Sequence, residues 1–541
     1  MGQQRIIVVG AGVGGLVAAL ALAAQGLEVV VCEAQAELGG KVRQVHIGGQ
    51  ALDAGPTVFT MRWVFDELFS QVGETLGAHL DLHKVETLAR HTWGQCRPFG
   101  PSTDSHDGQN SSGPESSQLD LYANIDRSAD AIGNFAGAAE ARRYLAFCKR
   151  ARLIYQTLEG PFLRGTRPNP LSLSLRVASQ GVAGLARISP FGTMWRELGQ
   201  YFQDPRLQQL FGRYATYCGS SPFMAPATLM LVAHVEQDGV WLIDGGMHAL
   251  VRTLAALAAR RGATFRYGAP VAEILTANGR ASGVRLADGE TITGAAVVFN
   301  GDAAALASGL LGAAAIQSVA SVNPATRSLS AITWNLVTPV QGFPLLRHNV
   351  FFSADSRAEF AALFAASGAA RLPPEPTVYV CAQDRTDKDS TAPLGGERLL
   401  CLVNSPANGD TLSAQNRAMT QDNIERCEQA TFARLKRSGL QLDRSAVQTL
   451  RTTPSDFNRL FPATGGALYG QASHGWMASF ARPGSRSRLD GLYLAGGSTH
   501  PGPGMPMAAL SGRQAASSVL ADLARQNRQA RQGADSLAGP A

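Results

Sequence analysis

The feature that most constrains the fold of this 541-residue chain is a run of glycines close to its N-terminus. A short apolar run at residues 6–9 is followed by Gly10-Ala11-Gly12-Val13-Gly14-Gly15 and then by an alanine- and leucine-rich stretch to about residue 26. A strand, a glycine turn and a helix in this order open a dinucleotide-binding unit. Gly10 permits the tight turn, Gly12 lets the backbone approach a pyrophosphate, and Gly15 lets the helix pack closely on the strand. The pattern predicts an α/β nucleotide-binding domain at the start of the chain.

The residues after the second predicted strand indicate which nucleotide is bound. This strand covers residues 28–32 and ends at Glu33, whose carboxylate can accept hydrogen bonds from both ribose hydroxyls and would repel the extra phosphate of NADP. Leu38-Gly39-Gly40-Lys41 follows. Its glycines let the chain fold back over the nucleotide, and Lys41 can face a phosphate or the ribose. This extension is typical of FAD-binding domains and absent from NAD sites, so the sequence predicts FAD.

A third glycine-rich element lies near the C-terminus. Residues 491–500 read GLYLAGGSTH, and a further helix is predicted from about 507 to 523. A helix N-terminus beside Gly496-Gly497 can point at the flavin ring, whose reduced form carries negative charge. No cysteine follows Cys427, so this loop cannot attach the flavin to a cysteine, and we expect FAD to be held non-covalently.

Because these elements lie at both ends of the chain, we expect one FAD domain interrupted by insertions. The predicted fold is α/β within an α+β whole: a Rossmann-type FAD-binding domain with an inserted substrate and membrane-associating domain. We assign residues 1–75, 241–302 and 451–525 to the FAD-binding domain, 76–240 and 303–450 to the substrate domain, and 526–541 to a disordered tail. Residues 100–118 are polar and rich in Gly, Ser and Pro, which predicts a surface loop between two strands. The region 135–240 is predicted to be mainly helical.

Composition excludes several other classes. Of the 48 basic residues only five are lysines, with no basic run, so nucleic-acid binding is not expected. The seven cysteines are scattered without a close pair, which argues against a zinc or redox site and for reduced thiols in the cytoplasm. Residues 6–24 carry no charge and would be long enough for a membrane span or a signal peptide. The glycine spacing explains this segment better as the strand, turn and helix above.

Further motifs carry a family resemblance over about residues 5–525. They are DAGPTVFT (Asp53–Thr60), GVWLIDGGMHAL (Gly239–Leu250), FNGD (Phe299–Asp302) and LYLAGGSTHPGPGMPMAALSGR (Leu492–Arg513). With the glycine fingerprint, they resemble the bacterial phytoene desaturase-type carotenoid desaturases of the amine-oxidase-like FAD superfamily. Within that group, Asp53–Phe69 and the ending GMPMAALSGR are similar to the 1-hydroxycarotenoid 3,4-desaturases, also called hydroxyneurosporene or methoxyneurosporene desaturases. In the C-terminal motif, phytoene desaturases more often have the sequence GAGTHPGAGIPG.

The resemblance implies an activity, a location and a set of cofactor contacts. The activity is FAD-dependent formation of the 3,4 double bond of 1-hydroxy acyclic carotenoids, with oxygen or a membrane quinone as final electron acceptor. The protein would lie in the cytoplasm, peripherally attached to the inner, photosynthetic membrane. The implied FAD contacts are Gly10, Gly12, Gly15, Glu33, Gly40, Lys41, Gly55, Pro56, Val271, Asn300, Gly496, Gly497, Met505 and Met507. Val271 would contact the adenine through its backbone.

The sequence assigns no catalytic residue. Desaturation needs a hydride acceptor and a place for a proton, and we find no Ser/His/Asp or paired-carboxylate arrangement. His234 and His500 are candidate bases, although a histidine on an apolar helix or in a glycine loop is more often structural. Candidates for an apolar substrate wall, each equally explained as a core residue, are Phe191, Trp195, Tyr201, Phe202, Phe211, Tyr214 and Tyr217.

Several other functions are compatible with these motifs. A phytoene desaturase, a carotenoid isomerase or ketolase, and an FAD amine oxidase or protoporphyrinogen-oxidase-like enzyme would share the FAD motifs. A prenyl-protein escort of related fold would be the non-enzymatic alternative, but such a protein should not need both glycine loops and Glu33. A flavin-disulfide reductase would need a close cysteine pair and a second nucleotide fingerprint, and the sequence has neither.

Overall fold

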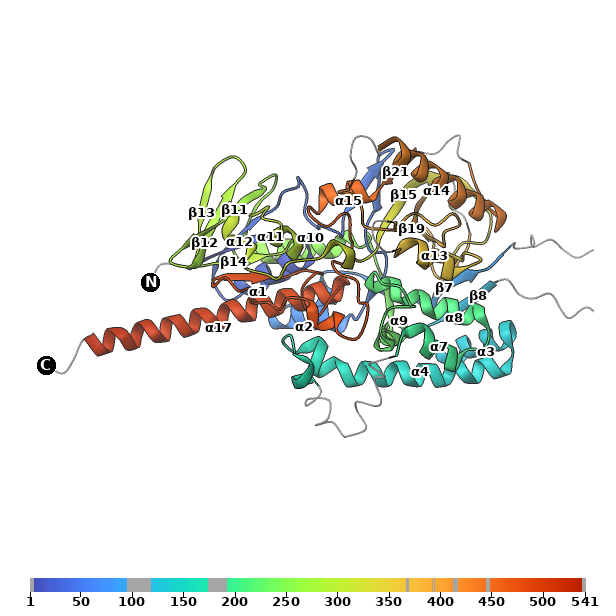
Figure 1. The fold of residues 1–541 in the computed structure, drawn as a ribbon, viewed down its shortest axis with the longest axis horizontal. Helices are drawn as coiled ribbons and strands as arrows, with labels where there is room; N and C mark the ends of the chain where they lie inside the picture. The colour runs from blue at the N-terminus through green and yellow to red at the C-terminus, as the bar shows by residue number, and fades with distance from the viewer. Residues whose placement is uncertain are drawn as a thin grey trace, which may run out of the picture.

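The computed structural model describes residues 4–94, 118–173, 192–365, 369–391, 393, 395–411, 417–443 and 448–537. The chain forms two halves that lie side by side (Figure 1). One half is built on a five-stranded parallel sheet. The other combines a seven-stranded sheet with a group of helices. Within these ranges, no helix combines the length and the apolarity needed to cross a bilayer.

The five-stranded sheet collects strands from three separated stretches of the chain. Its order is β10-β2-β1-β14-β22, with all neighbours parallel. Alternate side chains of β1 pack on opposite faces: Ile6 and Val8 face a core of helices, and Ile7 faces the small sheet β11-β12-β13. The strands are β1 (Arg5–Val9), β2 (Glu28–Cys32), β10 (Thr264–Arg266), β14 (Ala296–Phe299) and β22 (Leu492–Leu494), and the small sheet is β11 (Val271–Ala277), β12 (Arg280–Leu286) and β13 (Thr291–Thr293).

Two helices from opposite ends of the chain pack together on this sheet. They are α1 (Val13–Ala23) and α17 (Met505–Leu537), with α10 (His248–Arg260) beside α1. A Cβ atom at Gly512 of α17 would overlap the carbonyl oxygen of Gly14 in α1, and a Cβ at Gly14 would lie 2.8 Å from the amide nitrogen of Gly496. The absence of side chains at these positions therefore lets the N-terminal fingerprint and the C-terminal glycine loop meet.

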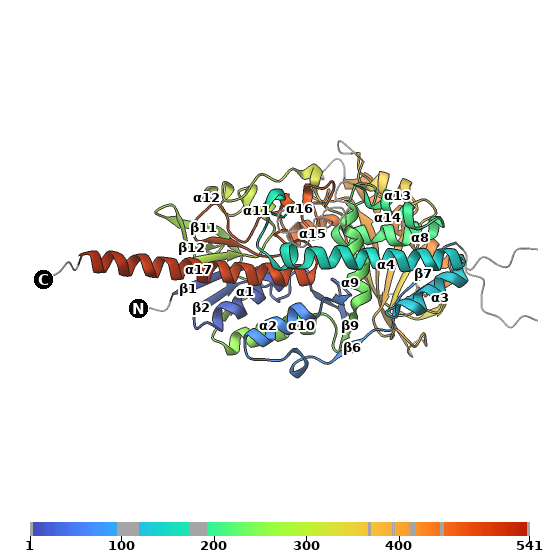
Figure 2. The ribbon, with the colours of Figure 1, turned by 90° about the horizontal axis from the view of Figure 1, so that it is seen from below.

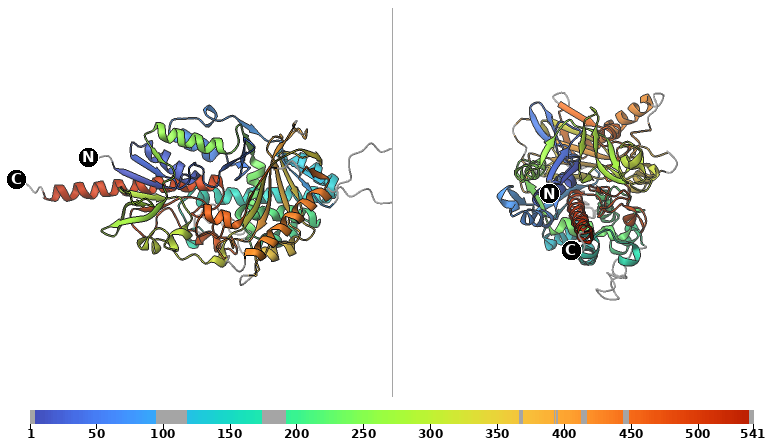
Figure 3. Two further views of the ribbon diagram at one scale, coloured as in Figure 1. Left: turned by 90° about the horizontal axis from the view of Figure 1, so that it is seen from above. Right: turned by 90° about the vertical axis from the view of Figure 1, so that its left-hand side faces the viewer.

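The second half contains the seven-stranded sheet, of order β21-β15-β19-β18-β17-β7-β8, in which only β17 and β7 pair in parallel. From above, this sheet stands at the end of the nucleotide half opposite the chain termini (Figure 3). The strands are β7 (Thr87–Thr92), β8 (Gln118–Tyr122), β15 (Ser330–Thr338), β17 (His348–Phe351), β18 (Val378–Ala382), β19 (Glu397–Ser405) and β21 (Gln448–Thr452).

The helical group covers one side of the second half, and from below α4 runs along it from the start of α17 to α3 (Figure 2). These helices enclose their own apolar core. The prediction of a mainly helical region over 135–240 is confirmed by the helices α3 (Ile125–Ala136), α4 (Ala138–Leu158), α7 (Met194–Tyr201), α8 (Pro205–Gly212) and α9 (Leu231–Asp238) and by the short helical turns η3 (Arg213–Cys218) and η4 (Ala227–Met230).

One buried aspartate joins the two halves. Asp53, at the end of β4 (Gln50–Asp53), accepts a 2.6 Å hydrogen bond from the Met247 amide, which precedes α10. Its backbone carbonyl accepts bonds from the side chains of Gln383 (2.9 Å) and Asn335 (3.2 Å) in the second half. The position of the following segment, Gly55–Thr57, is thereby tied to both halves.

Several sequence predictions differ from the structure. The disordered tail over 526–541 is wrong for its first part, because α17 continues to Leu537 without a proline to end it. Of the predicted wall aromatics, Tyr217 lines the large cavity described below, whereas Phe202, Phe211 and Tyr214 are buried in the helical core. Phe191 and nearly all of the 100–118 loop lie outside the described residues, although β7 and β8 do flank that loop as predicted.

Candidate functional site

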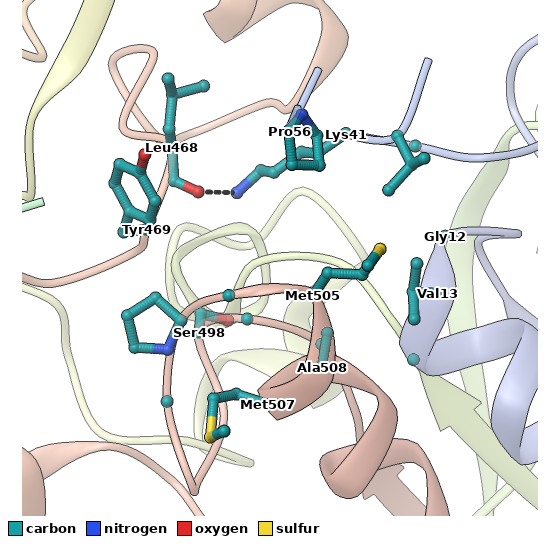
Figure 4. Close-up of a pocket in the computed structure, with 18 of the residues that line it drawn as sticks. Gly12, Val13, Lys41, Pro56, Leu468, Tyr469, Ser498, Met505, Met507 and Ala508 are labelled. Carbon is teal, nitrogen blue, oxygen red and sulfur yellow. Dashed lines mark hydrogen bonds between the residues drawn. The ribbon is translucent and has the colours of Figure 1, made fainter. Parts of the chain in front are cut away.

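A single cavity of about 1580 Å³ extends from the glycine fingerprint into the space between the two halves. This volume exceeds the roughly 300–1,000 Å³ typical of a pocket for one small ligand. Close to the nucleotide sheet the cavity is lined by glycine loops and both helix N-termini (Figure 4). Farther on its walls are aliphatic, with Leu229, Val232, Leu400 and Leu402 among them. The cavity therefore has room for a nucleotide cofactor and an elongated apolar ligand.

The predicted fingerprint has the geometry of a phosphate-binding turn. Gly10 adopts a left-handed φ of 98°, which favours glycine, and a Cβ at Gly15 would overlap the Gly10 carbonyl oxygen. The N-terminus of α1 has no side-chain cap, so its first amides remain free to bind an anion, and Gly12 and Val13 line the cavity there. Gly15 itself does not line the cavity, because its function is packing.

Glu33 lies at the carboxyl end of β2, where the sequence places it. The residue is buried, and its Oε2 accepts a 2.6 Å hydrogen bond from the Ala11 amide while Oε1 accepts one of 2.9 Å from the Gln35 amide. Each carboxylate oxygen has further acceptor capacity. Glu33 therefore holds the fingerprint turn and can still receive ribose hydroxyls.

Lys41 lies in the cavity wall but does not point at the phosphate loop. Its Nζ donates a 2.6 Å hydrogen bond to the Leu468 carbonyl, on the side of the cavity away from Gly12 and Val13 (Figure 4). Burial lowers the pKa of this ammonium, and the nearby charge of Asp302 opposes the effect. A buried ammonium needs a hydrogen-bond acceptor. The Leu468 carbonyl is that acceptor for Lys41, in place of the phosphate or ribose predicted from the sequence.

The remaining predicted FAD contacts gather around the same cavity. Asn300 donates a 3.2 Å hydrogen bond from Nδ2 to the Gly10 carbonyl, which joins the ends of β14 and β1. The other predicted contacts that line the cavity are Gly40, Gly55, Pro56, Val271, Gly496, Gly497, Met505 and Met507. Segments that are far apart in the sequence thus present one continuous surface for an extended nucleotide.

A buried arginine that the sequence analysis missed braces the C-terminal loop. Arg482 donates from Nη1 to the carbonyls of Tyr469 (3.0 Å) and Gly497 (3.1 Å), and from Nη2 to that of Gln471 (2.6 Å). Burial lowers the pKa of this guanidinium. No short motif marks Arg482, because its acceptors are backbone carbonyls that only the fold brings together.

The two candidate histidines lie elsewhere in the described structure. Neither His234 nor His500 is among the residues that line the cavity. His234 packs edge-on against Tyr155 at 5.0 Å, and burial lowers its pKa. His500 is fully buried, its Nε2 lies 3.1 Å from the Gly165 carbonyl, and burial lowers its pKa to about 4, so the ring is neutral near pH 7.

The apolar part of the cavity contains a group of charged and hydroxyl side chains. Arg213, Tyr217 and Glu236 line it from η3 and α9. Burial raises the pKa of Glu236 to about 7, and the Tyr214 hydroxyl and the Arg213 charge act in the opposite direction. A carboxyl in such surroundings can change its charge near neutral pH.

The residues of the nucleotide half fit FAD. Glu33 and Val271 suit the ribose and adenine, the free amides of α1 suit the pyrophosphate, and the loop from Gly496 to Met507 begins a second helix N-terminus at the far part of the same surface. A charged nucleotide alone would leave the aliphatic remainder of the cavity without an occupant.

Comparison with known proteins agrees with this geometry. Residues 13–520 match the family described as flavin-containing amine oxidoreductase. A hydroxyneurosporene desaturase of Rubrivivax gelatinosus is 52% identical over 98% of this chain and 95% of its own length. A protein of the same name from Cereibacter sphaeroides is 42% identical, covering 97% and 99%. A 4,4'-diapolycopene oxygenase of a Methylomonas species is 29% identical, covering 96% and 99%.

Solved structures share the fold. An oxidoreductase of Methanosarcina mazei aligns with a TM-score of 0.56 at 16% identity, covering 94% of this chain and 99% of its own. A putrescine oxidase variant redesigned in its cofactor binding aligns with a TM-score of 0.56 at 15% identity, covering 96% and 99%. These likenesses concern the architecture alone.

Replacing Glu236 by glutamine should change how stability depends on pH. The unfolded chain loses the Glu236 proton near its ordinary pKa of 4.5, whereas the folded protein holds it to about 7. The carboxyl therefore costs increasing stability as pH rises between these values, and the cost is constant above them. The amide lacks this cost. E236Q should gain stability over the wild type by up to about 3 kcal/mol between about pH 5 and pH 8.

Thermal unfolding of the FAD-loaded proteins across this pH range measures the effect. The matched control, Glu425→Gln, removes an exposed carboxyl on α14 (Arg417–Arg437) and should have little effect at any pH. A difference between E236Q and the wild type that does not change with pH would contradict the prediction. Two tyrosines that face Glu236 could also titrate. Burial raises the pKa of Tyr217 to about 12 and that of Tyr214 well above its ordinary value, so both stay neutral in this range.

Proposed function

This chain belongs to the flavin-containing amine oxidoreductase family, its cofactor is FAD, and from this premise we propose that it desaturates acyclic carotenoids. The bond formed is the 3,4 double bond of a 1-hydroxy carotenoid of the hydroxyneurosporene type. The named relatives support the substrate class, since three of them, at 39% identity or more, are called hydroxyneurosporene desaturases. The sequence similarity over Asp53–Phe69 supports the choice of bond.

The observation that carries the proposal is the continuity of the cavity. The same space that begins at Gly12 and Val13 continues between α9 and the seven-stranded sheet, where Val232, Leu400 and Leu402 line it. A long hydrocarbon placed there would exchange water for aliphatic surface, which favours binding by roughly 25 cal/mol per Å² of apolar area buried. A polyamine would find no row of carboxylates along these described walls.

FAD bound there would supply a two-electron acceptor for a hydride from one carbon of the carotenoid, and the proton lost from the neighbouring carbon would pass to the reduced flavin or to water. The chain's own residues hold the reacting carbons in place and keep water out, because hydride transfer depends on close approach and orientation. Leu229, Leu231 and Val232 form an aliphatic wall. Gly55 and Pro56, held by Asp53, and Gly496–Gly497, held by Arg482, form rigid surfaces at the nucleotide end.

We further propose that the protein takes its substrate from a bilayer and passes electrons to oxygen or a membrane quinone. Apolar side chains surround one end of the cavity. Pro170, Leu173 and Trp476 line it, Trp476 is also 44% exposed, and the adjacent Leu171 is 71% exposed. The two segments are joined by a 2.7 Å hydrogen bond from Arg167 Nη2 to the Phe480 carbonyl. A rim of this kind can enter the interfacial region of a membrane.

The proposed reaction predicts reduction of the bound flavin by one class of carotenoid. Purified FAD-loaded protein is mixed under anaerobic conditions with liposomes that contain 1-hydroxyneurosporene, and the visible flavin absorbance and the extracted pigment are followed. We expect the flavin to bleach and the pigment to gain a longer polyene with red-shifted absorption. An unbleached flavin with 1-hydroxyneurosporene but bleaching with phytoene would change the substrate assignment. A flavin left oxidised by every carotenoid and reduced by an amine would refute the desaturase proposal.

The proposed membrane rim predicts a loss of liposome binding when charge is introduced. Leu171→Glu and Trp476→Glu should each lower co-sedimentation with liposomes by about tenfold, because a charge replaces apolar surface that would enter the bilayer. Ile316→Glu is the matched control, since Ile316 is 44% exposed on the nucleotide half, away from the rim. Equal effects of all three substitutions would show that the rim has no special part in membrane attachment.

A further inference from the structure

A small polar cluster interrupts the aliphatic wall of the cavity. Three of its members, Arg213, Tyr217 and Glu236, come from the helical group. Thr57 and Tyr379 lie on the opposite side of the cavity. Aliphatic residues line the cavity around them. Burying charged and hydroxyl groups in such a wall is costly unless they are hydrogen-bonded. The hydrogen bonds of each side chain therefore indicate whether it holds the protein together or is available to a ligand.

Tyr379 and Thr57 are hydrogen-bonded to protein atoms. The Tyr379 hydroxyl lies 2.7 Å from Thr57 Oγ1 and 2.7 Å from His348 Nδ1. Thr57 directly follows Gly55 and Pro56, the segment that Asp53 positions between the two halves. These two side chains form a fixed polar wall that adjoins the proposed flavin contacts.

Arg213 is not engaged in this way. Its guanidinium makes one long contact, 3.5 Å from Nη1 to the Tyr217 hydroxyl, and lies 5.6 Å from the ring centroids of both Tyr217 and Tyr379. In the part of the chain that the structure describes, no carboxylate oxygen lies within 4.0 Å of it. An arginine has five N–H donors, so most of those on Arg213 are available to a ligand in the cavity.

Glu236 offers a hydrogen-bond acceptor where Arg213 offers donors. It is 8% exposed, and its Oε2 has no hydrogen-bond partner among the described residues. The carboxyl lines the same cavity as Arg213, and the Arg213 charge acts to lower its pKa. The two side chains nevertheless do not form an ion pair. The cavity therefore presents separate donors and an acceptor that are not satisfied by each other.

A hydroxyl group matches this arrangement, because it accepts a hydrogen bond and donates one. In a 1-hydroxy acyclic carotenoid the carbon that bears the hydroxyl is separated from the 3,4 bond by a single carbon. A site that binds this hydroxyl must therefore adjoin the place where hydride leaves the chain. The cluster meets this condition through Thr57, which follows the proposed flavin contacts Gly55 and Pro56 directly in sequence.

We propose that Arg213 and Glu236 form the subsite for the substrate hydroxyl: Arg213 donates a hydrogen bond to its oxygen, and Glu236 Oε2 accepts a hydrogen bond from its O–H group. This inference rests on the proposed function and deepens it. The subsite selects hydroxylated chains and places their 3,4 bond at the flavin. A chain that ends in hydrocarbon would leave most of the Arg213 donors and Glu236 Oε2 without partners in a dry wall, which is a strong penalty against that substrate.

The test compares two substrates on wild-type protein and on the double variant R213M/E236M. Each methionine approximates the length of the side chain it replaces, and removing both charges together avoids leaving one of them buried alone. Anaerobic single-turnover flavin reduction is measured with 1-hydroxyneurosporene and with neurosporene, and the rate at limiting substrate is compared. FAD content and thermal unfolding verify that the variant folds. Arg357→Met is the matched control, since Arg357 lies over the Phe223 ring and is not among the cavity-lining residues.

We expect the wild type and R357M to favour the hydroxylated chain by at least about tenfold. The double variant should lose this preference by slowing with 1-hydroxyneurosporene while its rate with neurosporene is unchanged or higher. Equal slowing with both substrates, or a wild type without preference, would overturn the subsite even though flavin reduction occurs. Failure of the wild type to reduce its flavin with either carotenoid would refute the proposed function, and the subsite with it.

Discussion

The close approach of α1 and α17 is the constraint on which the rest of this structure depends. Gly14 and Gly512 have no side chains, so the carbonyl of one lies where a Cβ of the other would be. This contact joins the helices that follow β1 and β22, two strands that flank β14 in one parallel sheet, and it places two helix N-termini beside one cavity. Parts of the chain between these two helices leave the nucleotide half and return to it. These parts form the second half with its aliphatic walls.

The two parts of the cavity make different chemical demands, and the fold meets them with different means. The nucleotide end is made of backbone: glycine turns, free helix amides and carbonyls, held by Glu33, Lys41 and Arg482. The far end is made of aliphatic side chains, with the cluster around Arg213 and Glu236 as its polar part. A hydride acceptor needs the first environment, and an insoluble chain that must be oriented without water needs the second.

Local patterns were sufficient to predict the nucleotide end. The strands, the turn and Glu33 follow one another within the first 33 residues, and Gly496-Gly497 has the same kind of sequence context. The sequence could not predict the acceptor of Lys41, because Leu468 is distant in the chain and only the fold brings it near. For the same reason Arg213 and Glu236 went unnoticed. Aromatic residues such as Phe211 were considered for the cavity wall but belong to the helical core, since a helical period does not distinguish a core from a cavity.

The most direct test of the account is the fate of hydrogen at the 3 and 4 positions of the substrate. 1-Hydroxyneurosporene that carries deuterium on both carbons is turned over once by the FAD-loaded protein without oxygen, and the product is analysed by mass spectrometry. The account predicts that the product loses two deuterium atoms, one from each carbon, as the flavin is reduced. A desaturated product that keeps all its deuterium would show that another bond reacts and would contradict the placement of the 3,4 bond at the flavin.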